Sequence, residues 1–187
     1  AIASLRAGQT GYTANAGLME LREAIAEELA RRYGVHYDPA REILVTVGVA
    51  EGIQLAMLAL VEPGDEVLIP EPCFVSYGPT AVFAGGRVVY VPTSVENDFQ
   101  VTAADLEPYI SPRTKVLMIG YPNNPTGAVL RRKTMEEIGE LVIKHDLFVI
   151  SDEIYDRLIY GRAYEEGHVC VPSIPGLRER TVLLGGF

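Results

Sequence analysis

Two patterns of apolar and polar residues alternate along the chain, and they predict different elements. From Leu18 to Leu29, apolar residues recur at spacings of three and four with charged residues between them, which predicts an amphipathic helix that ends at Gly34. Short apolar runs between such stretches predict strands. Further helices are expected at residues 49–61, 73–86, 102–110 and 131–146, and strands at residues 42–48, 66–72, 87–92, 114–122, 147–151 and 181–187. Pro79 would disturb the middle of the helix at 73–86, and Thr102 could cap the helix at 102–110.

The regular alternation of strands and helices predicts an α/β fold. Each crossover between parallel strands needs a dozen or more residues and usually contains a helix, so we expect a mostly parallel sheet flanked by helices on both faces, a three-layer α/β/α arrangement. The carboxyl ends of the strands then meet at one edge, where ligands bind in open α/β folds. No repeat or linker divides the 187 residues, so one domain, residues 1–187, is expected. The ends expected at that edge are Gly48 and residues 70–74, 121–124, 151–155 and 185–187.

Composition narrows the classes of partner. The formal net charge of -9 argues against a surface that collects phosphate backbones, so we expect no nucleic-acid partner. The apolar runs are much shorter than the roughly 20 residues that span a bilayer, and no leader pattern opens the chain, which favours a soluble cytoplasmic protein with no membrane partner. Two distant cysteines and three scattered histidines show no spacing of a metal site or a disulfide framework.

Residues that could bind a ligand or take part in catalysis follow several of the predicted strands. Val49 and Ala50 begin a helix, where free backbone N–H groups and the helix dipole can bind an anion, although the stretch also suits an ordinary strand-to-helix turn. Asp152 follows a buried strand, so its carboxylate must meet a cation or several donors, or else cap a turn together with Glu153. Tyr155 could direct its hydroxyl to the same place, or pack with a polar tip.

Two more candidates lie at the ends of neighbouring strands. Phe74 offers a flat face for stacking on a planar ring, although an aromatic residue there is also typical of a core. Asn124 is held between Pro122 and Pro125, which would fix its amide against a ligand or simply close a turn. An anion site, an aromatic plate, an amide, a carboxylate and a phenol at one edge together fit pyridoxal phosphate, a phosphorylated planar ring that contains nitrogen.

Three segments carry a resemblance to a known family. Residues 11–26 (GYTANAGLMELREAIA), 121–130 (YPNNPTGAVL) and 151–160 (SDEIYDRLIY) resemble the class I/II aminotransferases of fold type I, in the branch close to bacterial aspartate and aromatic aminotransferases. The resemblance covers essentially the whole chain. It implies the large domain of a pyridoxal-phosphate enzyme that acts on amino acids and 2-oxo acids and forms a homodimer.

The resemblance also implies a role for each candidate residue. Asp152 would pair with the pyridinium nitrogen of the cofactor, and Tyr155 and Asn124 would hydrogen-bond its ring oxygen. Phe74 would stack on the ring, where many relatives have Tyr or Trp. The backbone amides of Val49 and Ala50 would hold the phosphate, and Tyr12 would reach the phosphate of the cofactor in the partner subunit.

The chain departs from the family at both ends. The lysine that forms the Schiff base with the cofactor is expected two positions beyond Phe187, so no catalytic residue is expected within the chain. Lys115, Lys133 and Lys144 are poor substitutes, because one begins a strand and the others belong to a charged helix. The N-terminal arm and the C-terminal small domain of the family are also expected to be absent, which predicts an inactive fragment. A β-lyase on the same scaffold and a non-catalytic sensing or dimerisation module remain alternatives to the aminotransferase.

Overall fold

The computed structural model describes residues 1–161 and 167–186, and the chain divides into two compact units, Ala1–Thr46 and Val47–Phe187. The first unit contains α1 (Ile2–Arg6) and α2 (Met19–Tyr33). As the sequence predicts, α2 ends at Gly34, whose φ of 67° is a left-handed conformation that glycine adopts at little cost. The buried Arg22 of α2 donates hydrogen bonds to the carbonyl oxygens of Pro39 (2.9 Å) and Ala40 (3.3 Å), which ties the following segment to the helix.

The second unit is built on a parallel sheet. Among the described residues the sheet has five strands in the order β2-β1-β3-β4-β5, and all four neighbouring pairs are parallel. The chain moves outward from β1 to β2 and then returns to the other side of β1 to form β3, so the strand order reverses between β1 and β3. A crevice at the carboxyl ends of such strands is the usual ligand site of open α/β sheets. The strands are β1 (Glu66–Glu71), β2 (Arg87–Pro92), β3 (Thr114–Gly120), β4 (Phe148–Asp152) and β5 (Thr181–Leu184).

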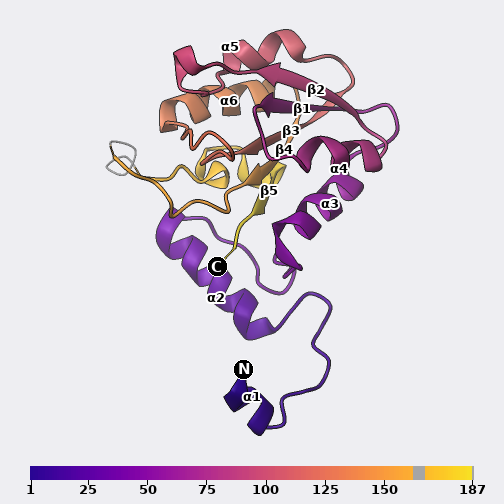
Figure 1. Cartoon of the computed structure of the whole chain (residues 1–187), viewed down its shortest axis with the longest axis vertical. Helices are drawn as coiled ribbons and strands as arrows, with labels where there is room; N and C mark the ends of the chain where they lie inside the picture. Colours follow the sequence, from indigo (N-terminus) through magenta and orange to yellow (C-terminus); the bar gives the residue numbers. More distant parts are fainter. Residues whose placement is uncertain (162–166, 187) are drawn as a thin grey trace. The chain divides into compact units, whose positions relative to one another are not determined.

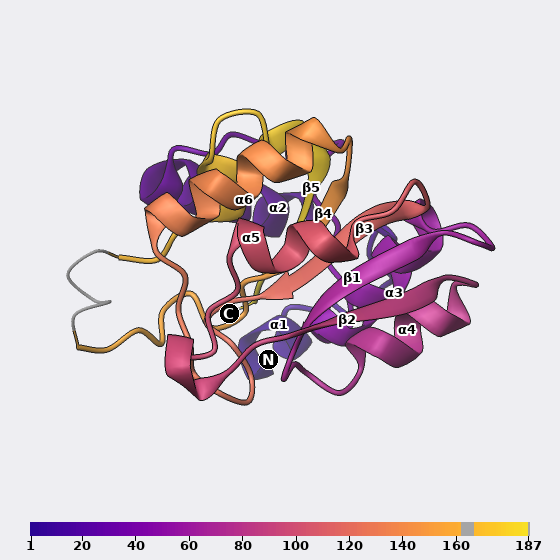
Figure 2. The same ribbon diagram turned by 90° about the horizontal axis from the view of Figure 1, so that it is seen from above.

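Helices cover both faces of this sheet. The helices α3 (Gly48–Leu60) and α4 (Tyr77–Phe83) lie on one face, and α5 (Ala103–Leu106) and α6 (Arg132–Lys144) lie on the other (Figures 1 and 2). The predicted three-layer α/β/α arrangement is therefore confirmed. Four short 3₁₀ helices complete the described elements of this unit: η1 (Val95–Asn97), η2 (Glu107–Tyr109), η3 (Val171–Ser173) and η4 (Arg178–Arg180).

The core consists of two apolar layers, one on each face of the sheet. In β3, Val116 and Met118 pack beneath α3 and α4, whereas Leu117 and Ile119 pack beneath α6 on the opposite face. This alternation follows from the two-residue period of a strand, and burial on both faces explains the continuous apolar run in the sequence. The same period decides which face each side chain at the end of a strand can reach.

The amino-terminal end of the sheet contains a buried charge that is fully paired. The Glu66 side chain is 1% exposed and accepts hydrogen bonds from Arg87 (2.7 Å), Arg113 (2.9 Å) and the Ser111 hydroxyl (2.7 Å). The Ser111 hydroxyl and the Arg87 guanidinium lower the pKa of Glu66 to about 2. This carboxylate therefore illustrates how the fold compensates a buried charge.

Several elements differ from the sequence-based prediction. Residues 42–48 were expected to form a strand, but no strand is present there and Gly48 already belongs to α3, because a strand requires a hydrogen-bonded neighbour and none of the described strands pairs with this segment. The helix expected at 73–86 is only α4, so Pro79 lies in its first turn, where a missing N–H is tolerated. The strand expected at 181–187 ends at Leu184, and Phe187 lies outside the described residues.

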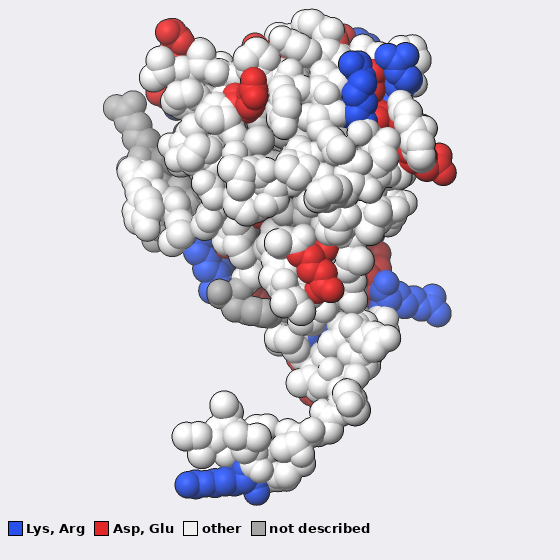
Figure 3. All heavy atoms as spheres, turned by 45° about the vertical axis from the view of Figure 1, so that its right-hand side comes forward, with Lys and Arg blue, Asp and Glu red and all other residues white. Residues whose placement is uncertain are grey.

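The surface carries both kinds of charge. On the face drawn in Figure 3, the Lys and Arg side chains of the described residues stand in small groups, several of them beside Asp or Glu. None of the helices in the described ranges is long and apolar enough to cross a lipid bilayer.

Candidate functional site

Asp152 is the last residue of β4 and lies beside Gly120 of β3. Its side chain is buried, with one carboxylate oxygen accepting a 2.8 Å hydrogen bond from the Tyr77 hydroxyl and the other a 3.3 Å bond from the Ile154 N–H. Burial raises the pKa of Asp152 above its usual value. In the described part of the chain no Lys, Arg or His forms an ion pair with it. Of the two alternatives, a cation or several donors, the described side chains and backbone therefore provide two neutral donors and no cation.

Tyr77 is a site residue that the sequence did not single out. It is the first residue of α4, and its ring is buried in an edge-to-face contact with Phe74, with 5.7 Å between the ring centroids. Burial and the neighbouring Asp152 carboxylate raise the pKa of its phenol far above the usual range. Its partner lies 75 residues away in the sequence, so no local pattern signals the pair.

Phe74 follows β1 and is only half-buried. One side of it packs against Tyr77 and the apolar layer beneath α3 and α4, so the core role considered for this residue is partly realised. The rest of the ring is accessible to another molecule, which keeps the stacking role as a prediction.

The two asparagines after β3 have different surroundings. The Asn123 side chain donates to the Gly120 carbonyl oxygen (3.2 Å) and accepts from the Thr126 N–H (3.2 Å) and hydroxyl (2.9 Å), so it closes the turn. Asn124 is half-buried, and its amide has no hydrogen-bond partner within the described ranges. The turn-closing role considered for Asn124 therefore belongs to its neighbour, and the amide of Asn124 can serve a ligand.

Val49 and Ala50 lie in the first turn of α3, where backbone N–H groups have no acceptor in a preceding turn. The helix leads through a short loop into the amino end of β1, and it packs across β4 and β5. With about 1.5 Å of rise per residue, it extends back along the sheet, so its first turn lies towards the carboxyl ends of the strands. Ala50 is exposed and Val49 half-buried, and the Glu51 carboxylate accepts a hydrogen bond from the Val47 N–H.

Tyr155 and Tyr12 complete the set of predicted residues. Tyr155 is half-buried, and its phenol lies close enough to Tyr77 to contribute to the raised pKa of that residue. Tyr12 belongs to the first unit, where its side chain is fully exposed. The structure thus gathers residues from the ends of β1, β3 and β4 at one edge of the sheet.

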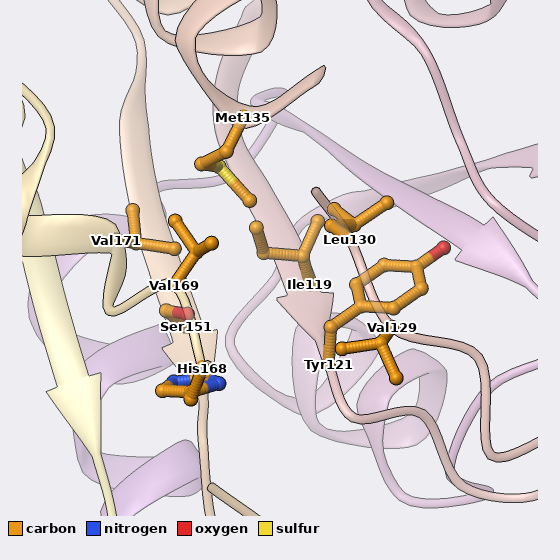
Figure 4. Close-up of a pocket in the computed structure, with 9 residues that line it drawn as sticks. All are labelled: Ile119, Tyr121, Val129, Leu130, Met135, Ser151, His168, Val169 and Val171. Carbon is orange, nitrogen blue, oxygen red and sulfur yellow. The ribbon is translucent and has the colours of Figure 1, made fainter. Parts of the chain in front are cut away.

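A second polar cluster lies behind Asp152 on the opposite face. Glu153 accepts hydrogen bonds from Ser151 (3.0 Å) and the Val171 N–H (2.9 Å), and one of its oxygens lies 2.5 Å from Nε2 of the buried His168. Figure 4 shows Ser151 and His168 beside Val169 and Val171, with Ile119 and Met135 across a small pocket. His168 is one of the three histidines whose scattered positions show no spacing of a metal site, so the sequence assigned it no role; in the structure it contacts Glu153, the residue that follows Asp152.

Comparison with known proteins identifies related chains. The family model described as "Aminotransferase class I and II" matches residues 3–187. The aspartate aminotransferase of Pyrococcus abyssi is 45% identical over 184 residues, which cover 98% of this chain and 46% of that protein. Aromatic-amino-acid aminotransferase 2 of Thermococcus litoralis is 42% identical over 184 residues, with 98% and 46% covered.

Solved structures give the same picture. The aromatic aminotransferase from Pyrococcus horikoshii superposes with a TM-score of 0.96 and 45% identity, over 100% of this chain and 49% of that one. The N-succinyldiaminopimelate aminotransferase from Mycobacterium tuberculosis gives a TM-score of 0.93 and 39% identity, over 99% and 48%. The chain spans about half the length of these relatives.

Proposed function

The chain belongs to the aminotransferase class I and II family, and we propose that it forms the cofactor-binding part of an enzyme that uses pyridoxal 5'-phosphate. The reaction is the transfer of an amino group from an amino acid to a 2-oxo acid. The names of the relatives support this reaction, because those proteins are aminotransferases for aspartate or aromatic amino acids.

A single observation carries the proposal, namely the contrast between two buried carboxylates on one sheet. Glu66, at the amino end of β1, is compensated by two guanidinium groups. Asp152, at the carboxyl end of β4, accepts hydrogen bonds only from the neutral donors Tyr77 and Ile154 in the described part of the chain. Burial of an uncompensated carboxylate is costly, so a site of this kind suits a cationic ligand group such as a protonated ring nitrogen.

The other residues fit the remaining parts of the cofactor. Phe74 offers a partly exposed ring for stacking. Asn124 offers an amide that has no hydrogen-bond partner among the residues that the structure describes, so it is available to a ring oxygen. The first turn of α3 offers N–H groups for a phosphate at Val49 and Ala50. When bound, pyridoxal phosphate supplies a ring that accepts electrons from the substrate. In this arrangement Asp152 holds a proton on the ring nitrogen, and Asn124 and Tyr155 orient the ring.

We further infer a homodimer in the cytoplasm. Tyr12 is fully exposed in the first unit, so its phenol is available to a second molecule. In the proposed dimer this phenol contacts the phosphate held by the partner subunit. Light scattering at increasing protein concentration tests the dimer, and cross-linking at Tyr12→Cys tests the position of that residue.

Binding of pyridoxamine 5'-phosphate to the 187-residue chain tests the cofactor site. This probe carries an amine in place of the aldehyde, so it cannot react with surface lysines. Isothermal titration calorimetry should detect weak binding that is lost with pyridoxamine, which has no phosphate. Asp152→Ala and Asn124→Ala should each weaken the binding. Glu66→Gln is the matched control, because it removes a buried carboxylate at the opposite end of the sheet, and it should bind as the unmodified chain does.

Turnover is tested on the protein produced from its complete coding sequence. We expect pyridoxal-phosphate-dependent transfer of the amino group from aspartate or an aromatic amino acid to 2-oxoglutarate, sharply reduced by Asp152→Ala. Release of ammonia from a β-substituted amino acid without such transfer would instead assign a lyase. If pyridoxamine binds as tightly as pyridoxamine 5'-phosphate, and Asp152→Ala does not weaken the binding, the proposed cofactor site is refuted.

A further inference from the structure

Tyr77 supplies the side-chain hydrogen bond that Asp152 receives in the described part of the chain. Its hydroxyl donates to one carboxylate oxygen at 2.8 Å, and the Ile154 N–H donates to the other at 3.3 Å. Each oxygen is thus held by one donor, and a carboxylate oxygen can accept a second. The orientation of the carboxylate is therefore fixed while part of its accepting capacity remains.

The phenol is itself held rigidly. Tyr77 begins α4, is 4% exposed and packs into the apolar layer that includes Ile53, Met118 and Ile150. Burial and the neighbouring Asp152 carboxylate hold the pKa of Tyr77 far above the usual range, so the hydroxyl is protonated at neutral pH. Tyr77 therefore acts as a permanent donor towards Asp152.

Gly120 provides the space that this donor occupies. A Cβ atom at position 120 would lie 2.3 Å from the Tyr77 hydroxyl oxygen and 3.3 Å from the adjacent ring carbon. The first distance is far below a normal contact, so any larger residue must displace the hydroxyl or the strand. Gly120 does not have a positive φ, so its backbone conformation does not require glycine. Gly120 of β3 is paired with Asp152 of β4. A glycine at this position leaves room for the Tyr77 hydroxyl beside the Asp152 carboxylate.

We infer that Tyr77 is a positioning residue, which orients the Asp152 carboxylate and favours its ionised form, and that Gly120 is required because it admits the Tyr77 hydroxyl. The claim that an oriented Asp152 carboxylate binds the ring nitrogen more tightly rests on the proposed function. The Tyr77–Asp152 hydrogen bond and the steric requirement for Gly120 do not depend on that function. The hydrogen bond from Tyr77 lowers the pKa of Asp152 and so opposes the effect of burial. Other titratable groups nearby are Glu153, whose charge raises the pKa of Asp152, and Cys73 and Tyr155, which lie near Tyr77.

The first test needs no cofactor. The pKa of Asp152 is measured by carbon-detected NMR titration in the 187-residue chain and in four variants: Tyr77→Phe, Gly120→Ala, their double variant and Tyr121→Phe. Tyr121 is the matched control, because it is also a buried tyrosine and its hydroxyl donates to the Phe99 carbonyl oxygen (3.1 Å), on the other face of the sheet. Tyr77→Phe should raise the pKa of Asp152, and Tyr121→Phe should leave it unchanged.

The double variant tests the role of Gly120. Gly120→Ala should raise the pKa of Asp152 and lower the stability when Tyr77 is present. In the Tyr77→Phe background the clashing oxygen is gone and only the 3.3 Å contact with the ring carbon remains, so the same substitution should have a much smaller effect on both the pKa of Asp152 and the stability. Additive effects of the two substitutions would overturn the inferred role of Gly120.

The second test connects the hydrogen bond to the ligand. Loss of one hydrogen bond that orients a charged group should weaken the affinity for pyridoxamine 5'-phosphate about threefold to tenfold in Tyr77→Phe. If the unmodified chain shows no binding that depends on Asp152, the proposed function fails. If it does bind in this way but Tyr77→Phe binds equally well, or leaves the pKa of Asp152 unchanged, the positioning role fails.

Discussion

The substitution Glu66→Gln examines the buried charge at the amino end of the sheet, far from the candidate site. It keeps the shape of the side chain but removes the negative charge that Arg87 and Arg113 share. At about 1.36 kcal/mol per pKa unit, the lowering of the Glu66 pKa from 4.5 to about 2 corresponds to about 3 kcal/mol. The two guanidinium groups are 65% and 64% exposed, so water weakens the attraction. We therefore expect the free energy of unfolding to fall by about 1 to 2 kcal/mol at neutral pH.

The pH dependence of this effect has a definite sign. The pKa of Glu66 is lower in the folded chain than in the unfolded chain, so its stabilisation is complete above about 4.5 and is lost as the pH falls towards about 2. The difference between the original chain and Glu66→Gln should therefore be smaller near pH 3.5 than near pH 7. Urea denaturation followed by circular dichroism at the two pH values measures it.

A surface ion pair provides the control for this experiment. Glu62 is 81% exposed at its side chain and lies 3.7 Å from Lys115, so Glu62→Gln should change the unfolding free energy by less than about 0.5 kcal/mol. An equal effect of the two substitutions would refute the reasoning, and so would a Glu66→Gln effect that does not shrink in acid.

Three further predictions concern the other end of the sheet and one helix. Asp152→Asn should raise the unfolding free energy of the cofactor-free chain near pH 7 but not near pH 3.5, because burial raises the pKa of Asp152 and its ionised form is the costly one; a loss of stability in urea at pH 7 would contradict this. Asn123→Ala should lower the free energy of unfolding by about 1 to 2 kcal/mol in the same assay, because three hydrogen bonds are lost. Asn124→Ala should change this free energy by less than about 0.5 kcal/mol but weaken the binding of pyridoxamine 5'-phosphate. The reverse pattern would exchange the roles of the two residues. Thr102→Ala should cost about 1 kcal/mol, since the Thr102 hydroxyl accepts from the Asp105 N–H at the start of α5, and Thr102→Ser should restore most of it.

Local patterns predicted most of the elements. The spacing of apolar residues gave the buried face of α6, where Met135, Ile138, Leu141 and Val142 are all buried. It also placed Gly34 at the end of α2 and Thr102 at the start of α5. These features depend on residues within one or two turns of each other, so the sequence contains the necessary information.

Features that depend on distant partners were not predicted. Residues 42–48 have the composition of a strand, but pairing requires another strand beside them. The division of labour between Asn123 and Asn124 depends on the geometry of the turn, which the sequence does not specify. The sequence predicted that Asp152 needs donors, but it did not identify Tyr77 as the donor. That pairing depends on the strand order, which places β3 between β1 and β4.

The strand order also bears on the kinetics of folding. Tyr77 and Asp152 are 75 residues apart, and their hydrogen bond forms only once β3 has aligned between β1 and β4. Contacts between such distant parts of a chain close slowly and carry a large entropic cost. A partially folded intermediate in which α6 and β4 had formed without β1 would contain Asp152 but lack its donor. The chain should therefore become able to bind a ligand at this site only when β1, β3 and β4 have all paired.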